Sequence, residues 1–155
     1  HYLNDSARLG WAMRRAIEMA APALAGDPLA YAELGDDLQP RRVAADPGRW
    51  GDVVIQRKDA ATSYHLAVVV DDARQGISHV VRGADLRAAT DIHRLLQVLL
   101  GLPEPRYRHH RLVLDRDGRK LAKRDGAESL ARLCQRGLSR DDIRRMVGLA
   151  PASAS

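Results

Sequence analysis

The chain is poor in cysteine and has no long apolar segment. Its one cysteine, Cys134, can form neither an internal disulfide nor a multi-cysteine zinc site, so we expect no zinc. A single cysteine is typical of a reducing compartment, and no signal peptide is visible, so we expect a cytoplasmic protein. No apolar run approaches the ~20 residues that span a bilayer. We therefore expect a soluble protein with no membrane partner.

The remaining composition is that of a globular protein with an uneven charge. The 155 residues suit one domain, or one large piece of a larger one, with 45% hydrophobic and 29% charged residues. Residues 1–103 hold 12 basic against 13 acidic side chains, whereas residues 104–155 hold 13 against 7. The basic final third fits contact with phosphates or nucleic acid, and it fits mere solubility equally well.

Short apolar segments predict neighbouring strands in the middle of the chain. Residues 7–24 are expected to be helical, and residues 26–51 to hold short strands or loops. The run SYHLAVVVDD, residues 63–72, predicts a strand buried on both faces, as in a parallel sheet. After a glycine turn, GISHVVRG, residues 76–83, predicts a second strand that carries Arg82 at its end.

A helix and a further strand are expected next. Residues 88–103, AATDIHRLLQVLLGLP, place apolar residues at helical spacing, with Thr90 as the expected N-cap and Gly101 as the stop. RHHRLVLD, residues 108–115, predicts the next strand. Two short helices are expected after it, from Ala127 to about Arg136 and from Ser139 onward. The alternation predicts an α/β fold with functional groups at strand ends and loops.

A cluster of cations interrupts the chain after that strand. The stretch DRDGRKLAKRDGAES, residues 115–129, carries five basic residues between Asp115 and Asp125. Such a loop can place ammonium and guanidinium groups on a polyphosphate and stabilise charge that develops during phosphoryl or nucleotidyl transfer. A solvated turn is the simpler interpretation of an isolated basic loop, and both stay open at this point.

Two further residues invite a substrate role. Tyr64 begins the first predicted strand and Arg82 ends the second. At such a strand end the guanidinium could bind a carboxylate through two parallel hydrogen bonds, while the phenol hydrogen-bonds beside it. Taken singly, each is a common packing or surface residue. The neighbouring histidines His109 and His110 lie on a predicted strand and point to opposite faces, so they cannot chelate one metal ion together.

Taken together and in order, these segments resemble a known family. SYHLAVVVDDARQGISHVVRGADL, followed by LPEPRYRHHRLVLDRDGRKLAKRDG, resembles the second half of the catalytic domain of glutamyl class I aminoacyl-tRNA synthetases, from about Asp52 to Leu149. Within that family, VVVDDARQGISHVVRGADLRAAT and DIRRMVGL are most similar to the group that glutamylates the queuosine of tRNA(Asp). The resemblance implies part of a class I Rossmann-like domain with a parallel sheet that ends in short helices.

The resemblance also implies a domain organisation and site residues. Residues 1–51 correspond to a connecting segment, residues 52–126 to the second half of the nucleotide-binding fold, and residues 127–155 to C-terminal helices and a tail. The segment KLAKR stands where the family has its KMSKS-type loop, which implies that Lys120 and Lys123 bind ATP and that Lys123 stabilises the transition state. Ala122 stands where the family usually has serine.

By the same resemblance, Tyr64 and Arg82 bind the glutamate substrate. We place His65 on the other face, because successive residues of a strand alternate. The implied reaction is attack of the glutamate carboxylate on the α-phosphorus of ATP, with Mg²⁺, and transfer of the activated glutamate to queuosine in tRNA(Asp). The expected partners are therefore tRNA and L-glutamate, and we expect a monomer.

One family element is missing from the sequence. Class I enzymes also use a HIGH-type motif in the first half of the nucleotide-binding fold, and no such motif is present here. We therefore expect this polypeptide alone to be unable to form glutamyl-adenylate. Two alternatives stay open: part of a glutamyl-tRNA synthetase that charges tRNA(Glu), and a non-catalytic tRNA-binding module.

Overall fold

The computed structural model describes residues 11–24, 26–56, 62–114, 118, 120 and 128–149. The chain divides into two compact units, residues 1–110 and residues 111–155, and each is described by itself. The expected division at residues 51 and 126 follows the functional parts of a catalytic domain rather than compactness, and it stays a prediction.

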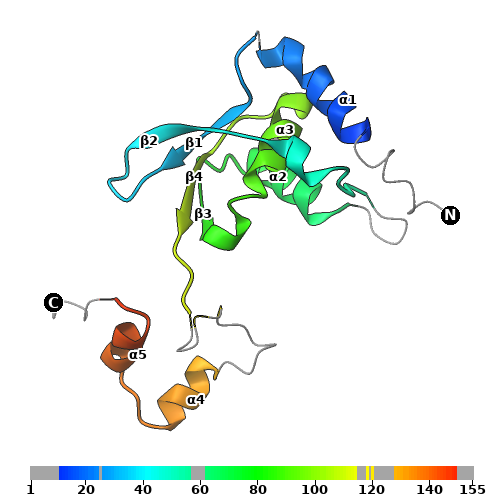
Figure 1. The fold of residues 1–155 in the computed structure, drawn as a ribbon. Helices are drawn as coiled ribbons and strands as arrows, with labels where there is room; N and C mark the ends of the chain where they lie inside the picture. Colours follow the sequence, from blue (N-terminus) through cyan, green and yellow to red (C-terminus); the bar gives the residue numbers. More distant parts are fainter. Residues whose placement is uncertain are drawn as a thin grey trace. The chain divides into compact units, whose positions relative to one another are not determined.

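A four-stranded, mostly parallel sheet is the framework of the first unit (Figure 1). Strands β1 (Ala30–Leu34) and β2 (Pro40–Ala44) form an antiparallel hairpin. Strand β4 (Arg106–His110) lies parallel to β1 on one side and parallel to β3 (His79–Gly83) on the other. The order is β2-β1-β4-β3, so β4 is central although it is the last of the four in the sequence.

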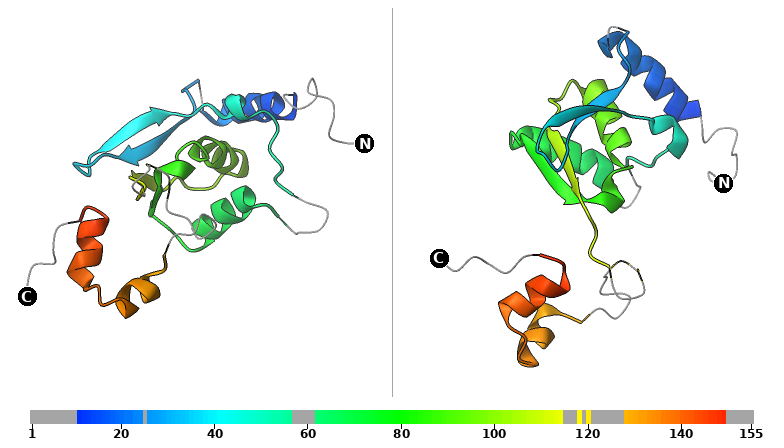
Figure 2. Two further views of the ribbon diagram at one scale, coloured as in Figure 1. Left: turned by 60° about the horizontal axis from the view of Figure 1, so that its bottom comes forward. Right: turned by 60° about the vertical axis from the view of Figure 1, so that its left-hand side comes forward.

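Helix α3 (Thr90–Leu100) packs against both other long helices of this unit. Its Leu95 contacts Ala20 of α1 (Trp11–Ala20), and its Ile92 and Leu96 pack with Val69 of α2 (Tyr64–Arg74). Figure 2 shows α3 between α2 and the β1–β2 hairpin. The short 3₁₀ helices of the unit are η1 (Ala21–Leu24), η2 (Pro47–Trp50) and η3 (Ala84–Leu86).

The predicted strand over residues 63–72 is wrong, because this segment forms helix α2. Its valines favour a strand by intrinsic preference, but such preferences are weak and yield to packing. Val69 is 3% exposed against Ile92 and Leu96 of α3, and that burial stabilises the helical conformation. Ser63 precedes the helix with extended backbone. The order in this region is therefore helix, strand, helix, strand.

Other expected boundaries are confirmed or shifted. The strand expected within residues 76–83 is confirmed as β3, whereas the one expected at residues 108–115 begins earlier and ends at His110. Gly101 ends α3 in the left-handed conformation that glycine adopts most easily, with φ of 63°. Thr90 is not the N-cap, which is Ala89; it is the first helical residue.

The described residues of the second unit include two short helices. Helix α4 (Leu130–Gln135) begins after Ser129, whose hydroxyl accepts from the backbone of Arg132. Helix α5 (Arg140–Met146) begins with a capping box between Ser139 and Asp142. The two expected helices are thus confirmed: α4 begins later than Ala127, whereas α5 is opened by Ser139 as expected. Across the residues that the structure describes, no helix is long and apolar enough to cross a bilayer.

Candidate functional site

Arg82 lies at the carboxyl edge of the parallel strands. It is the penultimate residue of β3 and pairs in register with His109, the penultimate residue of β4. Parallel strands bring their carboxyl ends to one edge of a sheet, where α/β folds bind ligands. The sequence prediction that Arg82 stands at a strand end is therefore confirmed.

Three acceptors hold the guanidinium of Arg82, one at each nitrogen. Its Nε donates to Nε2 of His109 at 3.3 Å, its Nη1 to Nδ1 of His93 at 3.1 Å, and its Nη2 to Oγ1 of Thr90 at 2.6 Å. Thr90 and His93 lie one turn apart on the first turns of α3, so they share a face. The plane of the guanidinium is thereby fixed from two elements at once.

Within the described residues, the positive charge of Arg82 is not neutralised by a direct ion pair, although it attracts the carboxylate of Asp72. Among the residues that the structure describes, no carboxylate forms an ion pair with this side chain, whereas Arg42, Arg49 and Arg87 each contact a carboxylate oxygen at 2.6 Å. The guanidinium also lies 5.2 Å from the ring centroid of Tyr107. A rigid, half-buried cation with neutral partners is suited to an anionic ligand.

Arg82 also fixes the ring protonation of His93. Because arginine only donates, Nδ1 of His93 must accept, and its Nε2 then carries the proton that it donates to Nδ1 of His65 at 3.0 Å. His93 is 1% exposed. Burial, reinforced by the neighbouring charges of Arg82, His65 and His109, lowers the pKa of His93 to about 3. The imidazole is therefore neutral at physiological pH.

A second chain of contacts leads from Arg82 to Glu33. Since Nε2 of His109 accepts from Arg82, its Nδ1 carries the proton and donates to Oε1 of Glu33 at 2.6 Å. Burial lowers the pKa of His109, and the hydrogen bond to Glu33 opposes that shift. The other oxygen of Glu33 accepts from Nη2 of Arg87 at 2.6 Å. Three strands and the segment after η3 thus meet at Arg82, His109 and Glu33.

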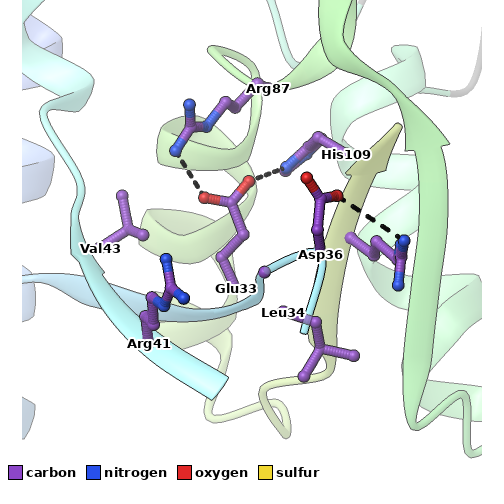
Figure 3. A pocket seen from close by; sticks show the side chains of 9 residues that line it. Glu33, Leu34, Asp36, Arg41, Val43, Arg87 and His109 are labelled. Carbon is purple, nitrogen blue, oxygen red and sulfur yellow. Dashed lines mark hydrogen bonds and ion pairs between the residues drawn. The ribbon is translucent and has the colours of Figure 1, made fainter. Parts of the chain in front are cut away.

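Glu33 and His109 also line an open cavity of about 290 Å³ beside the hairpin. Figure 3 shows Glu33 bridging Arg87 and His109, with Asp36 and Arg41 around the same space. Its walls are strongly charged, but their charges are largely paired: Arg87 with Glu33 and Arg41 with Asp37 at 2.8 Å. The cavity therefore offers polar contacts rather than a strong anion site.

Tyr64 and His65 flank His93 from helix α2. The Tyr64 ring centroid lies 5.8 Å from that of His93 and 5.6 Å from that of His65, and Tyr64 is 52% exposed. The prediction that His65 turns away from Tyr64 is wrong, because the segment is a helix and both rings pack around His93. Tyr64 and Arg82 are thus joined through one histidine.

The expected ATP-binding lysines can be placed only in part. Lys120 lies in the second unit, where its backbone forms an antiparallel bridge with Leu114. Lys123 and Ala122 lie outside the described residues. The roles predicted for both lysines stay predictions. Within the described parts of the chain, no group of three or more His, Cys, Asp or Glu side chains could hold a metal ion.

Sequence reasoning missed Thr90, His93 and His109 as partners of Arg82, and it missed Glu33 as the partner of His109. Thr90, His93 and Gln97 are polar, are at most 3% exposed and follow each other at helical spacing on α3. Polar residues at positions that the helical period assigns to the core are a signal that could have found two of them. No local pattern could have paired Glu33 with His109, because 76 residues separate them.

Comparison with known proteins gives one consistent family. The family described as class I tRNA synthetases (E and Q), catalytic domain, matches residues 27–150. Glutamyl-Q tRNA(Asp) synthetase of Rhodobacter capsulatus is 57% identical over 99 residues, which cover 64% of this chain and 36% of the relative. The protein of the same name from Xanthomonas oryzae pv. oryzae is 49% identical over 118 residues, covering 76% and 38%. The matched region thus spans just over a third of these relatives.

A solved structure agrees with this comparison. Glutamate-tRNA synthetase from Elizabethkingia anophelis superposes with a TM-score of 0.50 at 30% identity, over 63% of this chain and 19% of that chain. The neighbour therefore supports the expected α/β, Rossmann-like class of fold.

Proposed function

Because the chain belongs to the family of class I tRNA synthetases for glutamate and glutamine, we propose that it supplies the second half of a glutamate-activating catalytic domain. The acceptor that we propose is the queuosine of tRNA(Asp). The observation that carries this choice is the 57% identity to a glutamyl-Q tRNA(Asp) synthetase. We place the reaction in the cytoplasm and expect a monomer.

Arg82 and Tyr64 are the proposed glutamate-binding residues. A carboxylate needs two parallel N–H donors for bidentate binding, and a guanidinium has five N–H groups in a fixed plane. The contacts with His93, His109 and Thr90 account for one N–H on each nitrogen, which leaves a second on each terminal nitrogen for the ligand. The exposed phenol of Tyr64 lies on the neighbouring helix end and can hydrogen-bond to the same ligand.

MgATP is the proposed second substrate. One oxygen of the glutamate α-carboxylate attacks the α-phosphorus, the bond to the bridging oxygen breaks, and pyrophosphate leaves. Lys120 and Lys123 are proposed to neutralise charge on the phosphates, which favours the transition state over the ground state. Ala122 lacks the hydroxyl that is usual in the family, but Lys120 and Lys123 keep this loop cationic. Mg²⁺ is proposed to enter this scheme with the ATP phosphates.

The proposal predicts activity in a longer protein rather than in this chain alone. The curated relatives are nearly three times as long as the matched region. We propose that the remaining part supplies the HIGH-type motif and that the 155 residues by themselves do not form glutamyl-adenylate. Adenylate formation by the pure chain would overturn this part of the proposal.

Glutamate-dependent ATP–pyrophosphate exchange is the first test, run without tRNA on the 155-residue chain and on the full product of its gene. Activity only in the longer product is the expected result. Arg82→Lys should raise the glutamate KM about tenfold. An ammonium cannot make the paired hydrogen bonds that a guanidinium makes to a carboxylate, and each such charge-assisted bond is worth about 1.5–3 kcal/mol. Arg106→Lys, at the exposed start of β4, is the matched control and should behave as wild type.

A transfer assay then separates the acceptors. Labelled glutamate should appear on tRNA(Asp) that contains queuosine and not on tRNA(Asp) that lacks it. Labelling of tRNA(Glu) would favour a glutamyl-tRNA synthetase instead. Absence of exchange in both proteins, with tRNA binding intact, would favour a tRNA-dependent synthetase or the non-catalytic module.

A further inference from the structure

Both ring nitrogens of His93 contact neighbouring polar side chains. It is nearly fully buried, and its two ring nitrogens contact Arg82 at 3.1 Å and His65 at 3.0 Å. Its ring also packs against Tyr64 at 5.8 Å between centroids. One residue of α3 therefore contacts both proposed glutamate-binding side chains, one by a hydrogen bond and one through its ring.

We propose that His93 is a positioning residue, which as a neutral acceptor holds the guanidinium of Arg82 in the plane that a substrate carboxylate requires. This inference rests on the proposed function of Arg82. A carboxylate at this place would hold Arg82 equally well but would neutralise its charge and weaken its attraction for an anion. A charged imidazolium would instead expose an N–H to the guanidinium and repel it. Only the neutral ring both orients the cation and leaves its charge available.

The surrounding groups maintain this neutral state. Arg82 from β3, His65 from α2 and His109 from β4 all disfavour a proton on His93, and burial acts in the same direction. Glu33 contacts the far nitrogen of His109 rather than His93. Burial raises the pKa of Asp72 on α2, and the positive charge of Arg82 partly opposes this shift. No described carboxylate is bonded to the ring of His93 itself.

The kinetic test replaces the acceptor while it keeps the volume. His93→Leu removes the acceptor, whereas His93→Asn places a side-chain oxygen close to the former Nδ1. In ATP–pyrophosphate exchange with the full gene product, we expect His93→Leu to raise the glutamate KM about tenfold, in line with a lost hydrogen bond to a charged group. The kcat and the KM for ATP should change little. His93→Asn should restore most of the glutamate KM.

The controls separate positioning from general damage. A purely structural role would lower the active fraction and leave the glutamate KM unchanged, and that result in His93→Leu would overturn the inference. His79→Asn, an exposed histidine at the start of β3, should match wild type. A wild-type enzyme without glutamate-dependent exchange would refute the proposed function instead.

A spectroscopic test needs no activity at all. In ¹⁵N-labelled 155-residue chain, the ring nitrogens of His93 should show the tautomer protonated at Nε2, with an unprotonated Nδ1. The same pattern should persist to pH 5, because the pKa of His93 lies near 3. A ring protonated at Nδ1 would show that it does not accept from Arg82, and the inference would fail whatever the kinetics.

Discussion

Acid should destabilise the first unit through the buried His93. In the unfolded chain its pKa is 6.5, and in the fold it is about 3. Between these values the unfolded state binds more protons, so stability falls as pH falls, from about pH 6.5 downward. At pH 5, some 1.5 units below the unfolded value, the loss is about 2 kcal/mol at 1.36 kcal/mol per unit.

A comparison with His93→Asn isolates this contribution. Asn does not titrate, so any constant cost of the substitution cancels when the free energies of unfolding at pH 7 and pH 5 are subtracted. Both tryptophans of the chain lie within residues 1–110, so their fluorescence in urea titrations reports the first unit. Wild type should lose about 2 kcal/mol more than the variant between the two pH values.

Other titrating groups are present in both proteins. Burial also lowers the pKa values of His65 and His109, which adds to acid destabilisation in each protein. Burial raises the pKa of Asp91, which acts in the opposite direction. Equal losses in wild type and His93→Asn would refute the claim that a neutral, buried imidazole supports Arg82.

Two further predictions concern helix ends. Gly101→Ala should lower the free energy of unfolding by about 1 kcal/mol in the same urea titration. The cost comes from the backbone φ of 63°, which disfavours alanine, and not from a clash, since nothing lies within 4 Å of a new Cβ. An unchanged unfolding midpoint would contradict this. Ser139→Ala should lower the stability of α5 by about 1 kcal/mol, measured by amide hydrogen exchange. The Ser139 hydroxyl accepts a hydrogen bond from the backbone N–H of Asp142 at 3.2 Å, and alanine removes this cap. Ser139→Thr keeps the cap and is the control. Hydrogen bonds from Ser139 lower the pKa of Asp142 to about 2, and a carboxyl titration by NMR should show that value rising in Ser139→Ala.

The sequence predicted the α/β class and several elements, but not the conformation around Tyr64. A short apolar run such as residues 63–72 fits a buried strand and a buried helix equally well by periodicity. What decides is the packing of Val69 against Ile92 and Leu96, which is a property of the assembled unit. Gly101 and Ser139 were predictable because a left-handed stop and a capping box are local features of the chain.

The site also has residues that the sequence identified and residues that only the structure shows. Tyr64 and Arg82 were named from the ends of two apolar runs and from the family resemblance, whereas the partners of Arg82 come from α3 and β4. These contacts depend on the register of β3 against β4 and on the rotation of α3, which no local pattern specifies. The proposed roles of Lys120 and Lys123 rest on the motif alone.

The central place of β4 has a consequence for biosynthesis. Strands β1, β2 and β3 are translated first, yet β1 and β3 have no common neighbour until residues 106–110 emerge from the ribosome. During most of the synthesis of this unit, the β1–β2 hairpin and β3 therefore lack the strand that joins them in the sheet. Long-range parallel pairing of this kind is slow, because the loop-closure entropy is lost before the contacts form. Chaperone demand should accordingly peak just before His110 is exposed and fall once β4 inserts.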